Sequence, residues 1–463
     1  MYMPIRRLSL LLLAAMAAPL QAAPLQIDAN ARQSLSLTVY SQNLGLVRDT
    51  RHLPALAAGQ TVAIGDVSRR MQTETLSIRG AGSVLEQTLN TNLLSHHAIL
   101  QHYLGQELSL ARRNPASGDE SLATVTLLSV EGDRALVRRD DRVESVPLNQ
   151  DWRFIFPQLP PHLISKPSLE FRSRGTDASN DATFSYLTEG LGWQMDYVLN
   201  LDDSGNGMAL EGLATLHNDT GVDFRDASFQ LLAGSLNQPQ PVAYRKATLE
   251  MAAMAADAGA APPQAFQDYH LYSLPQRTDL LDQQHKQLPL VSIDALPVAK
   301  EYRHEFLALP RPDGQRHRSA PQTWLRFRND AGQPLPAGAV RAFAPDSGGR
   351  LQFIGGSRID HTAQGQDVEL QLGDAFDLSV ERQQTLFQKE YDADLLEYEV
   401  LVRNSGDADR QLQLAVNFTQ PWELQHSEPA LSQERGGRAI WTLDVPARDK
   451  RVLRFRVKLK KPQ

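Results

Sequence analysis

The fold of this chain is decided by residues 185–237, which read SYLTEGLGWQMDYVLNLDDSGNGMALEGLATLHNDTGVDFRDASFQLLAGSLN. Three apolar runs rich in strand-forming residues lie within this stretch, at 195–201, 210–216 and 229–234. Residues 202–207 and 218–221 separate the runs, and their Gly, Asn and Asp residues favour turns. Strands separated by turns at this spacing are typical of an antiparallel β-sandwich.

Length and composition bound the protein class. A chain of 463 residues is too long for one ordinary domain, and about three domains are expected. The hydrophobic content of 41% and the charged content of 22% are ordinary for a globular protein. The sequence contains no cysteine, which excludes disulfides, thiolate metal sites and thiol catalysis. Burial of a core must therefore stabilise the fold, which is feasible at this size.

The first 22 residues read as a secretory signal peptide. Arg6 and Arg7 precede an apolar run at 8–18, which is too short to span a bilayer with margin, and Ala22 is a suitable small residue before a cleavage site. We therefore expect a periplasmic or secreted protein. The abundance of Arg and Ala favours a bacterial source, and no later apolar run is long enough to predict a membrane span.

The charge balance argues against two classes of partner. Removal of residues 1–22 removes two arginines and no acid, which leaves 45 basic and 54 acidic residues and a net charge of −9. An acidic chain of this kind is not expected to bind nucleic acid or to adsorb to anionic lipid.

The remaining sequence predicts an all-β fold of serial antiparallel β-sandwiches with one short helix near 92–104. The helix prediction rests on apolar or imidazole side chains at one helical face, namely Leu93, His97, Leu100 and Leu104. Short strands at 107–156 predict a small β-barrel-like unit. Alternating strands at 396–402, 412–418, 439–445 and 452–459 predict a C-terminal immunoglobulin-like sandwich.

The middle of the chain contains a different kind of segment. Residues 252–263 are rich in Ala and favour a flexible insertion over a frayed helix. Residues 266–290 are polar, but their apolar anchors predict docking along a sheet. We therefore expect a signal peptide and four further parts, at 1–22, 23–91 (sandwich), 92–165 (helix and small barrel), 166–380 (central sandwich with a flexible insertion near 245–290) and 381–463 (immunoglobulin-like sandwich).

Six short motifs carry a resemblance to a known family. They are YSQNLGLVR at 40–48, YLTEGLGW at 186–193, DYV at 196–198, LLAG at 231–234, YSLP at 272–275 and PLPAGAVR at 334–341. Together they resemble the bacterial exported proteins grouped as domain of unknown function 4139. The resemblance implies an exported, β-rich protein and supplies no catalytic residues. A related branch, mucoidy inhibitor A, carries a coiled coil, and the absence of a heptad run here argues against that label.

Several constellations suggest metal sites, but a structural interpretation is favoured for each. Residues 202–213 imitate a calcium loop, yet Leu213 occupies the position that requires Glu, so a hairpin turn is expected. The acidic residues at 390–397 are expected to form a solvated strand edge. His96, His97 and His102 lack a zinc-protease arrangement, and His97 is expected to face the core. No metal or cofactor is predicted.

Glu189, Trp193 and Asp196 are the candidate ligand-binding residues. They flank a glycine-rich turn, and an indole with carboxylates is a common way to bind carbohydrate, although a core position for Trp193 is favoured. No nucleophile elbow, P-loop or dinucleotide fingerprint occurs. The leading hypothesis is a non-enzymatic binding or scaffolding protein of the cell envelope, with an envelope protein or glycan as partner. The alternative is an envelope glycan-binding protein or glycan hydrolase that uses carboxylates near Trp193.

Overall fold

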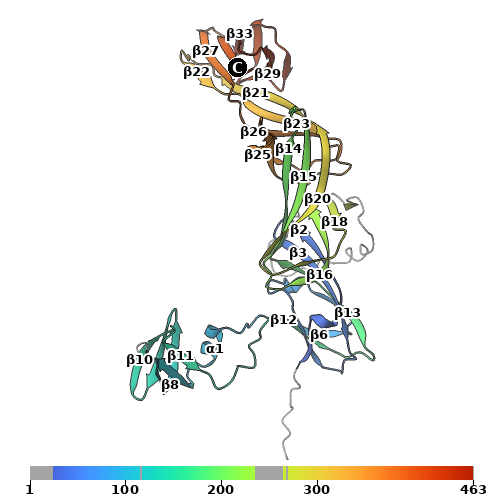
Figure 1. Ribbon diagram of the computed structural model, residues 1–463, viewed down its shortest axis with the longest axis vertical. Coiled ribbons are helices and arrows are strands. Elements are labelled where there is room, and N and C mark those ends of the chain that lie inside the picture. Colours follow the sequence, from blue (N-terminus) through green and yellow to red (C-terminus); the bar gives the residue numbers. More distant parts are fainter. Residues whose placement is uncertain (1–23, 115–116, 235–263, 267–268, 462–463) are drawn as a thin grey trace, which may run out of the picture. The chain divides into compact units, whose positions relative to one another are not determined.

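The computed structural model describes residues 24–114, 117–234, 264–266 and 269–461 (Figure 1). The predicted signal peptide at 1–22 and the Ala-rich segment at 252–263 lie outside these residues. Of the described residues, 64% are in strands and 3% in helices, and this confirms the all-β prediction. Within the described ranges, no helix is long and apolar enough to cross a membrane.

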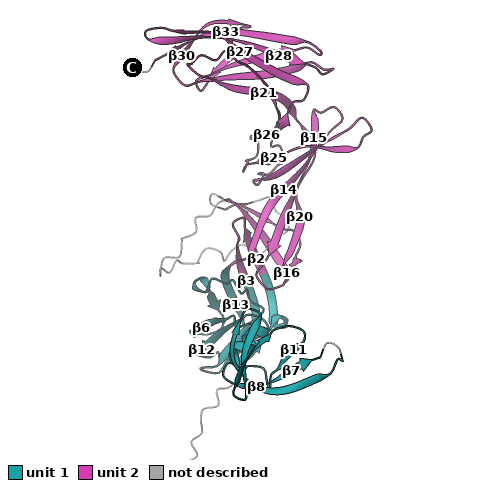
Figure 2. Cartoon of the chain, turned by 90° about the vertical axis from the view of Figure 1, so that its left-hand side faces the viewer, with its two compact units in different colours: residues 1–35, 48–187 teal, residues 36–47, 188–463 magenta. Residues whose placement is uncertain are grey.

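The chain divides into two compact units, drawn in different colours in Figure 2. Unit 1 contains residues 1–35 and 48–187, and unit 2 contains residues 36–47 and 188–463. The boundary passes through β2 (Arg32–Tyr40), β3 (Leu44–Leu53) and the last residues of β13 (Asn180–Glu189), so the residues of these three strands are divided between the units.

Apart from its α-helix and the sheet that follows it, which are described below, unit 1 contains two sets of paired strands and two short 3-10 helices. One sheet has the order β1 (Leu25–Ile27), β4 (Thr61–Gly65), β12 (Ser168–Ser173) and β6 (Val84–Asn90). Another runs from β3 through β13 (Asn180–Glu189) to β5 (Ser77–Arg79). The 3-10 helices are η1 (Ala29–Ala31) and η2 (Thr73–Thr75).

A buried ion cluster ties β1 to β3 within unit 1. The Arg51 guanidinium is fully buried and donates to Asp49 Oδ2 at 2.8 Å and to the Ile27 carbonyl at 3.1 Å. Arg32 donates to both Asp49 carboxylate oxygens at 3.0 Å. Removal of Asp49 would leave two buried cations without their counter-charge, a strongly destabilising change.

The helix and the predicted barrel-like unit also lie in unit 1. The helix, α1 (His96–His102), is followed by an open sheet with the order β10 (Arg142–Pro147), β9 (Arg134–Arg139), β8 (Glu120–Glu131), β7 (Glu107–Arg113) and β11 (Trp152–Ile155). Because β10 and β11 are its two edges, these described strands form no closed barrel.

The prediction that His97 faces the core is wrong. The helix begins at His96 after Ser95, whose Oγ accepts a hydrogen bond from the Ala98 N–H at 3.1 Å. Its buried side carries Leu100 and Tyr103, which pack on the sheet, and this leaves His97 exposed. A two-turn helix has too few apolar positions for the sequence to fix its buried face.

Unit 2 contains four sets of paired strands. The first has the order β17 (Gln264–Phe266), β18 (Tyr269–Ser273), β16 (Phe224–Ala233) and β2, with β19 (Thr278–Leu280) also paired to β16. The second has the order β20 (Gln284–Pro297), β15 (Gly207–Asn218), β14 (Leu191–Leu201), β24 (Gly338–Pro345) and β25 (Leu351–Ile359). β14 and β15 form the predicted hairpin, with Asp202 and Gly207 hydrogen-bonded across its turn at 2.9 Å.

The two remaining sheets of unit 2 enclose the C-terminal core. One has the order β26 (Asp367–Asp374), β23 (Gln322–Arg328), β21 (Ala299–Ala308), β29 (Arg410–Phe418), β32 (Arg438–Val445) and β31 (Gln433–Arg435). The other has the order β22 (Arg316–Ser319), β27 (Leu378–Lys389), β28 (Ala393–Asn404), β33 (Lys450–Lys460) and β30 (Trp422–Glu428).

Some of the sheets are mixed, whereas the sequence analysis expects antiparallel sandwiches; the sheets that contain β8 and β28 are antiparallel throughout. β14 pairs with β24, β16 with β2, and β21 with β29, each in the parallel direction. These partners are far apart in the sequence, and the period-2 pattern that identifies a strand carries no information about its neighbour. The described part of the predicted insertion, at 264–266 and 269–290, forms β17, β18, β19 and the start of β20. β17 pairs with β18, β18 and β19 pair with β16, and β20 pairs with β15.

The alternation predicted for the C-terminal strands is confirmed. Leu453, Phe455, Val457 and Leu459 are fully buried on one face of β33. Phe455 stacks on Tyr398 at a centroid distance of 5.4 Å and contacts Trp441 at 4.8 Å. Such aromatic pairs contribute beyond the area that they bury.

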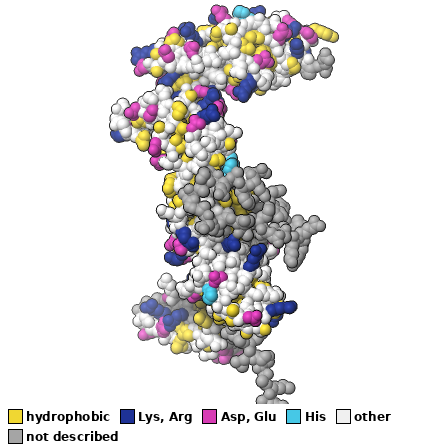
Figure 3. Space-filling model, turned by 90° about the vertical axis from the view of Figure 1, so that its right-hand side faces the viewer, with side chains coloured by type: hydrophobic (Ala, Val, Ile, Leu, Met, Phe, Trp, Pro, Cys, Tyr) yellow, Lys and Arg dark blue, Asp and Glu magenta, His cyan; other side chains and the backbone are white. Residues whose placement is uncertain are grey.

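The opposite face of β33 is basic, and three of its four basic side chains at 454–460 are matched by acids. Arg454 and Arg456 pair with Glu399 and Glu397 at 2.8 and 2.6 Å, and Lys458 pairs with Glu390 at 3.1 Å. Figure 3 shows basic and acidic side chains interspersed on the face that it draws. The row is therefore a solvated face of exposed ion pairs, with little free positive charge to attract an anionic polymer.

Three buried asparagines end strands of unit 2 in the same way. Asn218 and Asn404 close β15 and β28, and Asn329 directly follows β23. In each, Oδ1 accepts a hydrogen bond from the backbone N–H two residues ahead. Each Nδ2 donates to the carbonyl four residues ahead and to one or two carbonyls more distant in the sequence.

Each of these asparagine corners moves the chain from one sheet to another. The corner at Asn218 leads from β15 to β16, that at Asn329 from β23 to β24, and that at Asn404 from β28 to β29. The amide matches its site because it combines two donors with one acceptor group, and the corner carbonyls are buried from water.

Replacement of Asn404 by aspartate is expected to lower the free energy of unfolding by about 2–4 kcal/mol. A carboxylate offers no donor to the three carbonyls that Nδ2 binds, at Ala408, Val445 and Pro446. The loss should shrink as the pH falls toward about 4, because burial raises the pKa of this acid above its unfolded value. Calorimetric unfolding of the full chain measures the effect. Gln433→Glu, at an exposed amide of the same sandwich, is the matched control, and equal unfolding midpoints would contradict the prediction.

Candidate functional site

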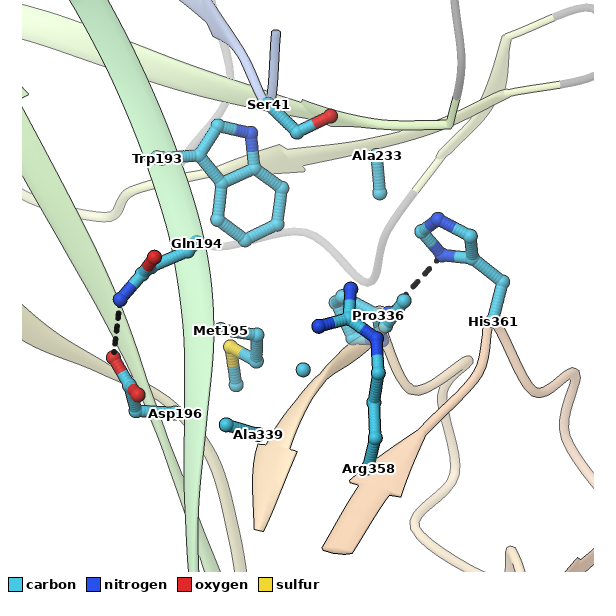
Figure 4. Close-up of a pocket in the computed structure, with 12 residues that line it drawn as sticks. Ser41, Trp193, Gln194, Met195, Asp196, Ala233, Pro336, Ala339, Arg358 and His361 are labelled. Atoms are coloured by element: carbon cyan, nitrogen blue, oxygen red, sulfur yellow. Dashed lines mark hydrogen bonds between the residues drawn. The ribbon is translucent and has the colours of Figure 1, made fainter.

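A cavity of about 280 Å³ lies within unit 2 (Figure 4). Residues 193–196 of β14 form one side, and 336–339, at the start of β24, form another. The remaining lining residues are Ser41 in the turn after β2, Ala233 at the end of β16, Arg358 on β25 and His361 just after β25.

Trp193 is part of the core beside this cavity. Its side chain is almost entirely buried, its Nε1 donates to the Leu232 carbonyl at 3.1 Å, and its ring lies 6.4 Å from that of Tyr272. The predicted core position is confirmed. Because most of the indole is covered by protein, Trp193 supplies a wall of the cavity and offers no broad face on which a sugar ring could stack.

Asp196 is a lining residue, but its carboxylate lies across β14 from Arg358 and His361 (Figure 4) and is already occupied. Oδ2 accepts hydrogen bonds from Thr215 Oγ1 at 2.8 Å and from Gln194 Nε2 at 3.3 Å, and Oδ1 accepts from the Arg341 guanidinium at 3.3 Å. The side chain is 14% exposed, so these partners satisfy most of its acceptor capacity. Asp196 therefore positions neighbouring side chains and is poorly placed to accept a further proton donor.

Glu189 does not join the other two candidates. It is exposed at the end of β13, directly before Gly190, whose φ of 89° turns the chain toward β14. Its side chain is not among those that line the cavity. The structure thus places Trp193 and Asp196 at one cavity and Glu189 outside it.

The loop at 334–338 forms the wall opposite β14 and is fixed by two tyrosines. Tyr197 donates to the Pro336 carbonyl at 2.8 Å, and Tyr272 donates to the Pro334 carbonyl at 3.2 Å. Burial raises the pKa of Tyr197 and the pKa of Tyr272 well above the ordinary value for a phenol. Both hydroxyls therefore remain donors at any physiological pH. Motifs that carry the family resemblance therefore meet at this cavity.

The far side of the cavity is cationic. His361 Nδ1 accepts a hydrogen bond from the Ala337 N–H at 3.1 Å. Burial lowers the pKa of His361 below its ordinary value, nearby His270 and Arg358 lower this pKa further, and Asp360 opposes them. Arg358 has no hydrogen bond or ion pair with any described residue.

Sequence analysis did not single out Ser41, although it lies in the YSQNLGLVR motif, and no local motif marks Arg358 and His361. They are separated from Trp193 by more than a hundred residues, and only the pairing of β14 with β24 and of β24 with β25 brings the last two to the cavity. For Arg358 and His361, the one available signal was the PLPAGAVR motif, which forms the adjoining wall. Across the described ranges, no three His, Asp or Glu side chains are close enough to hold a metal ion.

Gly338 is expected to tolerate no side chain. A Cβ at this position would lie 2.4 Å from the Met195 carbonyl oxygen, within the parallel pair of β14 and β24. Gly338→Ala should therefore lower the free energy of unfolding by about 1–3 kcal/mol and displace the cavity wall. Gly373→Ala is the matched control, because a Cβ there meets open space. Thermal unfolding compares the two, and equal midpoints would contradict the close packing described.

A comparison with models of protein families gives a match that includes most of the strands around the cavity. The family model described as Domain of unknown function (DUF4139) matches residues 182–463, which include every cavity residue except Ser41. No curated protein matches the sequence. Since the match spans more than half of the chain, this protein belongs to the family of the domain of unknown function DUF4139.

Proposed function

We propose that this chain is an exported, non-enzymatic binding protein of the bacterial cell envelope and that the cavity beside Trp193 is its ligand site. The observation that carries the proposal is the state of Asp196. It is the one carboxylate side chain among the described lining residues, and Thr215, Gln194 and Arg341 already occupy it. General acid–base catalysis needs a group free to exchange a proton with the substrate.

The same geometry disfavours the glycan-hydrolase alternative. Glycoside hydrolysis ordinarily uses two carboxyl groups about 5–10 Å apart on either side of the scissile bond. Glu189 is exposed outside the cavity, so Asp196 has no second acid facing it from the described lining. Trp193 presents no open face to a sugar, which also weakens a carbohydrate site built on stacking.

The cellular setting is part of the proposal. The basic and apolar segment at 1–22 supports export to the periplasm of a Gram-negative bacterium, where a chain without cysteine relies on core packing alone. We propose that the two-layered C-terminal sandwich is immunoglobulin-like and that the partner is an envelope protein or glycan. Gln194 is an exposed lining residue and gives a position at which such a partner can be trapped.

Photocrosslinking in living cells tests the proposal. A benzophenone amino acid at Gln194 should give one dominant adduct, and the same amino acid at Gln433, exposed on the C-terminal sandwich, should not. Protease treatment and mass spectrometry then tell a protein adduct from a glycan adduct. An adduct no stronger at Gln194 than at Gln433 would contradict the ligand site, and envelope-glycan turnover that Asp196→Asn abolishes would contradict the non-enzymatic assignment.

A further inference from the structure

We propose that the cavity beside Trp193 recognises its ligand through a carboxylate group held by Arg358 and His361. This inference rests on the proposed function, because it names the chemistry of the ligand at the same site. Three observations carry it: the charge balance of the lining, the hydrogen-bonding groups left available and the apolar surface beside them.

The charge balance leaves one cation unmatched. Two lining side chains bear full charges, Asp196 and Arg358. The Asp196 carboxylate is opposed by Arg341, at 3.3 Å, whereas Arg358 pairs with no described residue. An anion is the ligand whose charge complements that of Arg358.

The position of Arg358 explains how its guanidinium reaches the cavity. Arg358 on β25 lies opposite Ala339 on β24, and the small alanine leaves space above the strand. Figure 4 shows the Arg358 guanidinium and the His361 ring on the side of the cavity that faces Trp193. The planar guanidinium presents parallel N–H donors whose spacing matches the two oxygens of a carboxylate.

His361 adds a donor of defined orientation. Because Nδ1 accepts the Ala337 N–H, the neutral ring must carry its proton on Nε2, and protonation would leave Nε2 a donor. The side chains of Arg358 and His361 therefore supply N–H donors to a ligand and no free acceptor. A carboxylate accepts hydrogen bonds through both oxygens and donates none, which fits this arrangement.

The neighbouring surface accommodates the rest of a small ligand. Trp193, Met195, Ala233 and Pro336 give the lining an apolar part, and the volume of about 280 Å³ is that of a pocket for a small molecule. An organic acid with a compact apolar body would place its carboxylate on Arg358 and its body against these residues.

The test compares benzoate with benzamide, which share a ring and differ in the charge of the polar group. Isothermal titration and saturation-transfer NMR with the full chain should detect benzoate and give an affinity for benzamide at least tenfold weaker. Arg358→Gln should weaken benzoate binding at least tenfold and leave benzamide unchanged, with Arg358→Lys between the two. Arg350→Gln is the matched control, because Arg350 lies on the same hairpin with its side chain 82% exposed and does not line the cavity.

Three results would overturn the inference: equal affinities for benzoate and benzamide, no binding of either, or binding of inorganic phosphate in preference to benzoate. Arg358 is exposed, so Arg358→Gln should keep the wild-type unfolding midpoint, which separates a lost contact from a lost fold. A specific crosslink at Gln194 with no benzoate binding would reject the carboxylate inference and leave the proposed ligand site standing. Loss of the crosslink would reject the proposed function itself.

Discussion

Two of the three buried asparagine corners, at Asn218 and Asn329, are the constraint on which the cavity of unit 2 depends. The corner at Asn218 leads into β16, which ends beside the cavity at Ala233, and the corner at Asn329 leads into the 334–338 loop and β24. Each corner carries the chain from one sheet to another, so its hydrogen bonds decide where the next strand starts. A chain without disulfides has no covalent alternative at these positions. The hydrogen bonds of each amide offset the cost of burying it, because they satisfy backbone carbonyls that would otherwise be unpaired.

The sequence predicted those parts of the fold that depend on local pattern. Alternation identified β29 and β33 with their buried faces, and the glycine-rich turn at 202–207 identified the hairpin of β14 and β15. Features that depend on distant residues were not predicted, including the parallel pairing of β14 with β24. The burial of α1 was also misassigned at His97, because a seven-residue helix carries too little periodicity to fix its orientation.

The candidate site shows the same division between local and distant information. Trp193 and Asp196 are three residues apart on β14, and the sequence identified them together. Arg358 and His361 reach the cavity only through the order of the strands in the sheet. Glu189 is near Trp193 in sequence, but the turn at Gly190 separates their strands. Hydrogen bonding further changes the interpretation of Asp196. A carboxylate that suggests catalysis in the sequence is held by Thr215 and Arg341 in the structure, and the cation without a partner, Arg358, becomes the more informative group.

The central claim is that Arg358 and His361 bind a carboxylate without chemistry, and the ring resonances of His361 test it most directly. Because Nδ1 accepts the Ala337 N–H, the neutral ring donates through Nε2, and bound benzoate should shift the nitrogen resonance of this Nε2. At the same benzoate concentration, Arg358→Gln should give a smaller shift. Ring resonances of His361 that are unchanged at saturating benzoate in the wild-type protein would contradict the account.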